Sequence, residues 1–480
     1  MVEFLNTVDS VLYYPILIVV LAVAGIYFSI RTRFVQVRLF VEAIRTLVEK
    51  PQEEGGVSSL DALFVSTASR VGTGNIIGVS TAICLGGPGA AFWMWVLAII
   101  GASSAFVEST LAQIYKRRDH HTGECYGGPA YYIESALHSR WLGVVFAAFL
   151  ILTYAFGFNL LCSYNMQSTF ETYSFYNPSV TPWIIGVILA VLVGFCLFGG
   201  GKRIVKTTSV LVPFMGLFYV FLVYLIVVIN YDKIPSVIVA IMRDAFDFEA
   251  IGGGIAGSCL MYGIKRGLYS NEAGVGSAPN AAAAAHVSHP VKQGLAQVIS
   301  VYIDTLFLCT ATAMMCLVSG VPGTAENAGA MYVQLAVSKT FDAAGPVFIT
   351  VAMALFAFTT LLGNLFYVHN AIAFINNKKM PGKKVMTVIH IACCLVVLFG
   401  AVTPMDACWA LADITMGGMA LINLPACVIL GNVAFMALRD YERQRKQGRN
   451  PAFIARYIKL DPSKLDYWKH KERDSKASPF

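Results

Sequence analysis

The chain has 480 residues, of which 57% are hydrophobic and only 13% charged, and its formal net charge is +7. A soluble domain has about 25% charged residues, so this composition excludes a soluble globular protein and indicates a membrane protein. The basic residues lie in loops and in the tail rather than in a groove with interleaved aromatic residues, so we expect no nucleic-acid partner.

The first predicted helix covers residues 11–30 and is retained, because no basic segment precedes it and no small-residue cleavage site follows it. The loop after it is rich in basic residues, which places that loop in the cytoplasm and the N-terminus outside. These residues are Arg31, Arg33, Arg38, Arg45 and Lys50.

Apolar runs of about 20 residues, enough to cross a bilayer, recur to residue 437, and we count about eleven in total. After the first, they are residues 60–85, 90–115, 141–167, 183–198, 205–229, 237–285, 294–317, 346–374, 385–402 and 407–437. With this assignment the Lys/Arg-rich loops fall on one side. The stretch MYVQLAV is too short to span and predicts a re-entrant or lid helix.

The segment SRVGTGNIIGVSTA interrupts the second apolar run. A broken helix exposes backbone groups that lipid cannot satisfy, so it survives only where it lines a cavity inside the protein. Its glycines admit a ligand to the main chain, and the helix that follows presents free N–H groups to an anion. We expect an amino acid carboxylate near Val71 to Asn75.

The run YGIKRGLYSNEAGVGSAPN interrupts a second span. Carbonyl groups freed from about Met261 to Ile264 would receive an ammonium group or a cation, which completes a zwitterion site. The alternative for both breaks is that glycines only allow close helix packing. Charged and Asn residues beside each glycine cluster favour a binding site, because packing does not need them.

Five spans lie between the breaks, and the second half divides into another five with opposite loop polarity. This pattern predicts an inverted-topology repeat. The transmembrane domain is then residues 1–437, with an additional helix at 11–30, a first repeat at 58–230 and a second at 236–437. Residues 438–480 form a basic cytoplasmic tail, which we expect to be an amphipathic surface segment.

The two long motifs, SRVGTGNIIGVSTAICLGGPGAAFWMW and YGIKRGLYSNEAGVGSAPNAAAAA, resemble the signatures of the alanine or glycine:cation symporters, within the amino acid-polyamine-cation superfamily. The resemblance covers residues 11–437. It implies an all-α fold of the leucine-transporter type, a five-plus-five inverted repeat with one additional N-terminal helix. It also implies uptake of alanine or glycine across the inner membrane, driven by sodium or sometimes protons, with no organic cofactor.

Site residues follow from the same resemblance. Substrate contacts are implied at Gly72, Thr73, Gly74, Asn75, Met261, Tyr262 and Gly263. A sodium site is implied at Ala68, Val71, Phe356, Thr359 and Thr360, and oxygen ligands suit such a hard cation. For the two threonines the alternative is a hydroxyl bonded back to its own helix.

Several charged residues fall in or beside the spans, where a charge costs about 2.5 to 3.5 kcal/mol on insertion scales. We expect Arg70 and Arg266 to pair with acids such as Glu108, Glu272 or Asp304 in a gating or structural network.

Three other readings stay open. A cation channel would show a filter or charge ring built by several subunits. An intramembrane enzyme would have to use His286, His289 or Glu272, which show no HExxH spacing. A proton-coupled or glutamine-type carrier would use titrating acids or a larger pocket. Oligomeric state is not predicted, and the expected partners are the amino acid and membrane lipid.

Overall fold

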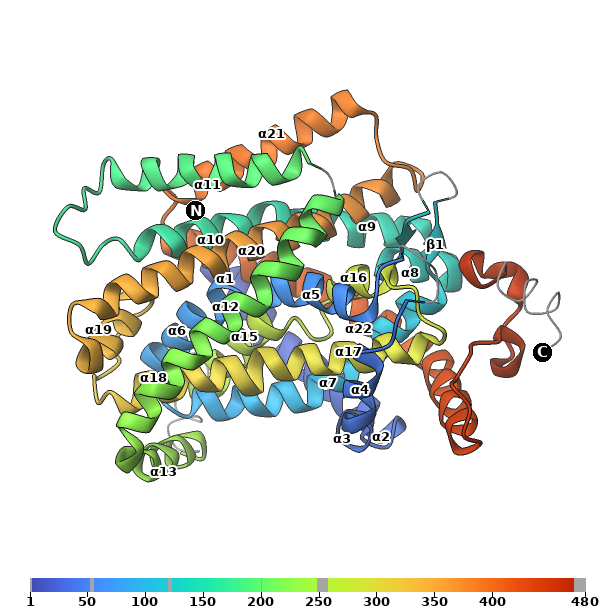
Figure 1. Cartoon of the computed structure of the whole chain (residues 1–480), viewed down its shortest axis with the longest axis horizontal. Helices are drawn as coiled ribbons and strands as arrows, with labels where there is room; N and C mark the ends of the chain where they lie inside the picture. The colour runs from blue at the N-terminus through green and yellow to red at the C-terminus, as the bar shows by residue number, and fades with distance from the viewer. Residues whose placement is uncertain (1, 52–55, 120–122, 200, 248–257, 470–480) are drawn as a thin grey trace.

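The computed structural model describes residues 2–51, 56–119, 123–199, 201–247 and 258–469. Most of the long helices run along the long axis of the molecule, and a short β-ribbon lies toward the end that carries the C-terminus (Figure 1). The strands are β1 (Arg117–Arg118) and β2 (Cys125–Tyr126), paired antiparallel.

The helices of the N-terminal half are α1 (Val2–Val11), η1 (Leu12–Leu17), α2 (Ile18–Arg31), α3 (Val35–Arg38), α4 (Phe40–Leu47), α5 (Ser59–Arg70), η2 (Gly74–Gly78), α6 (Val79–Gly86), α7 (Ala90–Ile114), α8 (Pro129–Leu137), α9 (Arg140–Ile151), η3 (Leu152–Gly157), α10 (Phe158–Ser168), α11 (Thr181–Leu197) and α12 (Gly201–Ile229).

Those of the C-terminal half are η4 (Tyr231–Lys233), α13 (Ile234–Ala245), α15 (Cys259–Asn271), α16 (Ala278–Ala284), α17 (Pro290–Val301), η6 (Tyr302–Cys309), α18 (Thr310–Val318), α19 (Ala330–Phe341), α20 (Ala344–Ile375), α21 (Lys383–Gly400), α22 (Met405–Lys446), η7 (Ala455–Ile458) and η8 (Pro462–Lys464).

Eight helical stretches in the described part of the chain are long and apolar enough to cross a membrane, and Gly74–Gly86 and Thr181–Leu197 are shorter apolar helices. The prediction of an all-α polytopic membrane protein with two discontinuous helices is confirmed. The boundaries of the two repeats stay a prediction.

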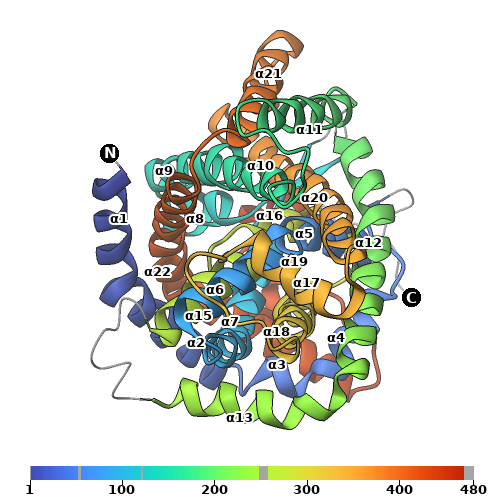
Figure 2. The same ribbon diagram turned by 90° about the vertical axis from the view of Figure 1, so that its left-hand side faces the viewer.

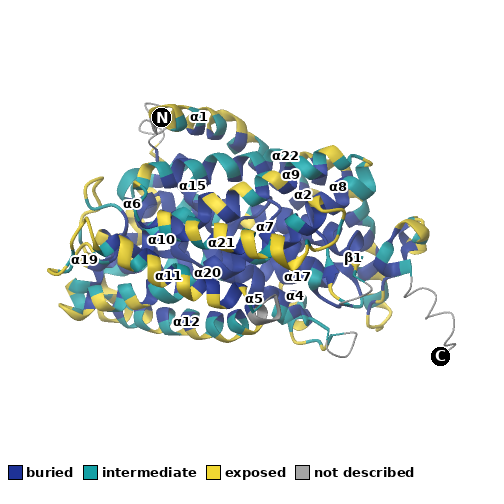
Figure 3. Ribbon diagram, turned by 90° about the horizontal axis from the view of Figure 1, so that it is seen from above, coloured by how far each residue is buried: buried dark blue, intermediate teal, exposed yellow. Residues whose placement is uncertain are grey.

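The helices form an inner group and an outer group. Within the most apolar 18-residue stretch of each spanning helix, 67% of the residues are buried in α7, but only 28% in α12 and 22% in α21. Seen from one end, α5, α16 and α17 lie in the middle, while α1, α12, α13 and the α11/α21 pair lie outside (Figure 2). Exposed residues follow the outer faces of α11, α12 and α21 (Figure 3), as expected for helices that meet lipid.

The first broken helix starts at a capping box, because the Ser58 hydroxyl accepts the Asp61 N–H while the Asp61 carboxylate accepts the Ser58 N–H. It stops at Val71, whose ψ of 90° is extended. The chain resumes as π-helix η2 and continues into α6.

The second broken helix starts at the N-cap Ser258 and stays regular to Asn271. The helix ends where Glu272 takes a φ of 52°, and Gly274 and Gly276 also have positive φ before α16 begins. The prediction that carbonyl groups are freed from Met261 to Ile264 is wrong, since an α-helix uses those groups in its own hydrogen bonds. The break is at residues 272–277.

The structure also describes two segments outside the spans, the MYVQLAV stretch and the C-terminal tail. The MYVQLAV stretch forms α19, at the end of the molecule far from the C-terminus (Figure 1). The described part of the tail packs against the protein, and Phe453, Tyr467 and Trp468 are buried. Residues 470–480 of the predicted tail lie outside the described residues.

Candidate functional site

Asn75 holds the first break in shape. Its Oδ1 accepts the Gly72 N–H at 2.8 Å, so this amide is not free for a ligand. Its Nδ2 lies within hydrogen-bond distance of Ser270 Oγ at 3.1 Å and of Asp304 Oδ1 at 2.8 Å. One fully buried side chain therefore ties the first break to α15 and η6.

The first break continues as the π-helical segment η2, and η3 and η6 are also π-helical. Such turns are frequent at functional sites, because the wider turn disturbs the regular helical ladder. η2 packs directly against η6, so two irregular backbones meet at the point where the helix is broken.

Helix α20 lies very close to the first break. A Cβ atom built on Gly72 would overlap Thr360 Oγ1, and one built on Gly363 would lie 2.6 Å from the Ser69 nitrogen. Thr360 Oγ1 is buried and has no hydrogen-bond partner among the described residues. An oxygen atom that lies unpaired beside the end of a helix is available to a cation, since the last carbonyls of α5 have no partner within their own helix.

Thr359 is fully buried one residue earlier on α20. Its hydroxyl lies 3.0 Å from Leu355 O and 3.1 Å from Phe356 O, so it bonds back to its own helix. The lone pairs of this oxygen are still available, because donation uses only the hydrogen. Of the two threonines, only Thr360 has an unpartnered hydroxyl.

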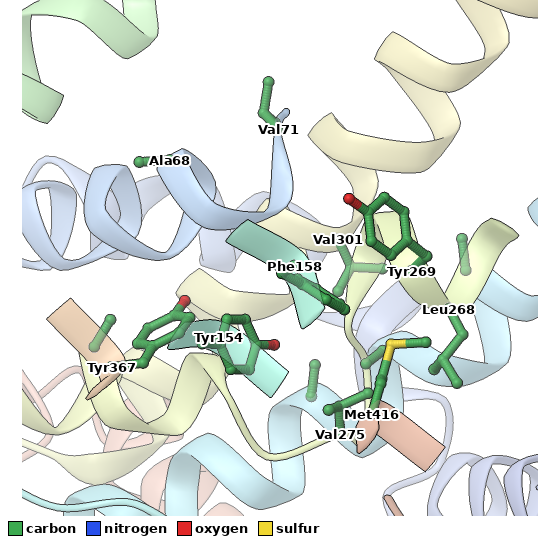
Figure 4. Close-up of a cluster of buried hydrophobic side chains, with 14 of the residues drawn as sticks. Ala68, Val71, Tyr154, Phe158, Leu268, Tyr269, Val275, Val301, Tyr367 and Met416 are labelled. Atoms are coloured by element: carbon green, nitrogen blue, oxygen red, sulfur yellow. The ribbon is translucent and has the colours of Figure 1, made fainter. Parts of the chain in front are cut away.

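A polar and aromatic wall surrounds the start of η2. Asn165 Nδ2 donates to Thr73 Oγ1 at 3.1 Å, and its Oδ1 has no partner in the part of the chain that the structure describes. The Tyr269 ring covers Gly74, at 2.7 Å from a Cβ built there. Figure 4 shows Phe158 between Tyr154 and Tyr269, near the end of α5. Large aromatic rings therefore pack beside the first break.

Two carboxylates anchor the second break. Glu108 Oε1 accepts the Gly274 N–H at 3.3 Å, and its Oε2 accepts Asn423 Nδ2 at 2.7 Å. Glu272 Oε2 accepts the Ser277 hydroxyl at 2.6 Å, while Oε1 lies 3.2 Å from Ser69 Oγ on α5. The acids thus bind the linker to its neighbours and one of them reaches the first broken helix.

Arg70 lies near these acids, but among the residues that the structure describes it makes no ion pair within hydrogen-bond distance. Its Nη1 donates to Gln297 Oε1 at 3.1 Å, and Nε and Nη2 have no partner. Its charge acts on Glu108, Glu272 and Asp304. The predicted ion pairs of Arg70 with these acids are not formed within the described residues, because Gln297 takes its Nη1 and the acids are bound by other donors.

Arg266 takes an acid that the sequence analysis did not assign to it. Its Nη2 lies 2.8 Å from Asp413 Oδ2 on α22, and its guanidinium lies 3.6 Å from the centroid of the Trp409 ring. The neighbouring Lys265 pairs with Asp9 of α1 at 2.5 Å. Both cations of this run are therefore neutralised from distant parts of the chain.

The predicted substrate residues divide into two groups. Gly72, Thr73, Gly74 and Asn75 lie at the first break, whereas Met261, Tyr262 and Gly263 lie inside α15, away from the second break. All five predicted sodium residues are buried at the end of α5 or on α20.

Sequence reasoning missed Asn165, Ser270 and Trp409. A lone Asn in α10, near the start of η2 in space but far from it in the sequence, carries no recognisable pattern. In the described part of the chain no group of three or more His, Cys, Asp or Glu residues gathers in a way that could hold a metal ion.

The chain matches the profile of the family described as sodium:alanine symporter family over residues 1–455. It is 41% identical to the putative sodium/proton-dependent alanine carrier protein YrbD of Bacillus subtilis over 98% of both chains. It is 41% identical to the probable sodium/glutamine symporter GlnT of the same organism, over 94% of this chain and 93% of the relative.

Among solved structures, the crystal structure of MhsT in complex with L-phenylalanine is similar, with a TM-score of 0.52 and 15% identity over 80% of this chain and 96% of that one. At this identity the likeness concerns the fold, which agrees with the transporter architecture expected from the sequence.

Proposed function

This chain belongs to the sodium:alanine symporter family, and we propose from this premise that it carries alanine or glycine into the cell together with sodium. The family consists of membrane transporters, so the chain is not an enzyme. We further propose that it lies in the inner membrane with its N-terminus outside and its C-terminus in the cytoplasm.

The observation that carries the sodium proposal is the contact between Gly72 and Thr360. The unpartnered Thr360 hydroxyl lies against the end of α5, where carbonyl groups lack partners in their own helix. A sodium ion would take the carbonyls of Ala68, Val71 and Phe356 with the hydroxyls of Thr359 and Thr360. Only oxygen ligands are then used, as a hard cation prefers.

The substrate carboxylate would lie at the start of η2 and α6, near Thr73 and Gly74, whose amides open a helix and attract an anion. Asn75 would shape this site through its bond to Gly72. Close rings, Tyr269 above all, limit the side chain to the size of alanine or glycine.

Sodium binding would promote substrate binding because the ion positions the backbone of the first break. An ion between α5 and α20 draws the first break into shape, and the ordered break then offers its amides to the carboxylate. Each charge that moves inward through 100 mV contributes about 2.3 kcal/mol, enough to favour accumulation. Release requires the inner ends of α5 and α16 to part from their neighbours.

Uptake of radiolabelled alanine into proteoliposomes tests the proposal, with inward sodium, potassium and proton gradients imposed separately and unlabelled glycine or glutamine as competitors. Uptake that needs the sodium gradient and is inhibited by glycine supports it. Uptake driven equally by protons overturns sodium coupling, and inhibition by glutamine but not glycine overturns the substrate assignment. Empty liposomes are the control.

A further inference from the structure

The C-terminal segment folds back onto the protein after α22 ends at Lys446. We call residues 449–469 the strap. Phe453, Ile458, Leu465, Tyr467 and Trp468 of the strap are each at most 5% exposed. If the chain end only lay in water, these aromatic and aliphatic side chains would be exposed. Their burial therefore means that the strap packs against a defined surface of the protein, which we call its seat.

The seat of the strap is residues 285–292, which comprise the connection from α16 and the start of α17. We call this segment the gate loop. The Phe453 N–H donates to Ser288 O at 2.9 Å, and Ser288 Oγ donates to Pro451 O at 2.8 Å. Lys292 Nζ reaches Asn450 Oδ1 at 2.7 Å. Main-chain and side-chain bonds therefore join the strap to the gate loop at Ser288 and at Lys292.

The strap also holds the end of α7. Trp468 Nε1 donates to Gln113 O at 2.9 Å, and Lys116 Nζ lies 3.9 Å from the centroid of the Tyr467 ring. The same Lys116 Nζ donates to Ala285 O at 2.6 Å, where Gln113 Nε2 also donates at 3.0 Å. Tyr467 and Trp468 thus pack against Lys116 and Gln113, the two residues that donate hydrogen bonds to the start of the gate loop.

The gate loop in turn holds the start of the first broken helix. The His286 N–H donates to Val57 O at 2.9 Å, and the Val57 N–H donates to His286 Nδ1 at 3.2 Å. The His286 ring lies 6.2 Å from the Tyr467 ring, centroid to centroid. A continuous set of contacts leads from the strap through His286 to Val57, the residue before the N-cap of α5.

We infer that Tyr467 and Trp468 are positioning residues for transport, which keep the inner ends of α5 and α16 closed while substrate binds from the other side. The inference rests on the proposed function. Figure 1 shows the tail at one end of the molecule and α19 at the opposite end, so the strap acts on one gate only. Loosening it lowers the share of molecules that are ready to bind external substrate.

The test compares the full-length wild type with Trp468→Ala, Trp468→Phe and Tyr457→Ala, all in nanodiscs and proteoliposomes of one lipid composition. Tyr457 is in the strap but 57% exposed, so its variant is the matched control. Hydrogen–deuterium exchange is followed in residues 57–70, in the gate loop and in α19, and alanine uptake gives KM and the maximal rate.

We expect Trp468→Ala to raise exchange in residues 57–70 and in the gate loop but not in α19. KM for external alanine rises about threefold or more at an unchanged maximal rate, because apparent affinity falls with the competent fraction. Trp468→Phe, which keeps a ring, lies between Trp468→Ala and wild type, and Tyr457→Ala matches wild type.

Unchanged exchange in the gate loop of Trp468→Ala, or a rise that includes α19, overturns the inference. A wild type without sodium-driven alanine uptake would defeat the proposed function instead, and the exchange data would still decide whether the strap holds the gate loop.

Discussion

The two breaks are held by different chemistry. Neutral groups shape the first: Asn75 bonds to Gly72, and Asn165 bonds to Thr73. Carboxylates hold the second, and both oxygens of Glu108 and of Glu272 accept hydrogen bonds. Among the described residues, Thr360 Oγ1 and Asn165 Oδ1 are unpaired near the first break, and Asn271 Nδ2 is unpaired at the second. The unpaired oxygens lie near the first break, so we propose that the ligands bind there and that the second break is mainly a structural joint.

The largest effect is expected from Gly72→Ala, which would disrupt the close contact between the first break and α20. The added Cβ would overlap Thr360 Oγ1 in a fully buried place, and overpacking of this kind costs about 1 to 3 kcal/mol. Uptake should fall to the level of empty liposomes. Gly216→Ala is the control, since a Cβ there meets nothing within 4 Å, and normal uptake by Gly72→Ala would contradict the close approach.

Thr360→Val and Thr359→Val separate the two hydroxyls at nearly constant shape. We expect Thr360→Val to raise the half-saturating sodium concentration about tenfold, which corresponds to about 1.4 kcal/mol. Thr359→Val should have a smaller effect, because that hydroxyl also bonds to its own helix. Sodium titrations of alanine uptake measure both, and equal sodium dependence in Thr360→Val and wild type would remove Thr360 from the site.

Glu108→Gln tests the second break. The Gly274 and Asn423 N–H groups both donate to this carboxylate, and the amide would turn its own NH₂ group toward one of them. We expect a loss of about 1 to 3 kcal/mol in stability with little change in KM. Thermal unfolding in detergent measures the loss, and the exposed Glu326→Gln is the control. A large rise in KM at unchanged stability would make this break a ligand site.

The smallest effect concerns Glu134, outside the membrane, which pairs with Lys378 at 2.7 Å and Arg140 at 3.1 Å. Burial alone raises the pKa of Glu134, but the two cations outweigh it and hold the pKa below its usual value. The stabilisation is thus present above the unfolded pKa of about 4.3 and is lost as pH falls through the folded pKa.

Because the pair is near the surface, Glu134→Gln should cost at most about 1 kcal/mol at neutral pH. Unfolding measured over a pH series should show the difference from wild type shrink below about pH 4. A difference that grows on acidification would contradict a lowered pKa of Glu134 in the folded protein.

The sequence was sufficient to predict most of the helical spans and the first break, because Gly72, Gly74 and Asn75 lie within a few residues of one another. It located the second break too early. Lys265 and Arg266 suggested an interruption, but Asp9 and Asp413 neutralise them from far along the chain, so α15 continues. Pairing across such separations leaves no local pattern.

The strap was hidden for the same reason. The sequence after residue 438 is polar and basic in composition, and its aromatic residues are scattered along it. Their seat consists of Gln113, Lys116 and the gate loop, which lie more than a hundred residues earlier in the chain. Local composition reports what a segment contains, whereas its burial depends on surfaces that form only on folding.

The central claim is that sodium and alanine move together through a site where Thr360 faces the first break. The most direct measurement is the uptake of radioactive sodium and of labelled alanine in the same proteoliposomes, for wild type and Thr360→Val. We predict a sodium influx that depends on alanine in the wild type and is strongly reduced in the variant. Alanine uptake with no accompanying sodium influx in the wild type would contradict the account.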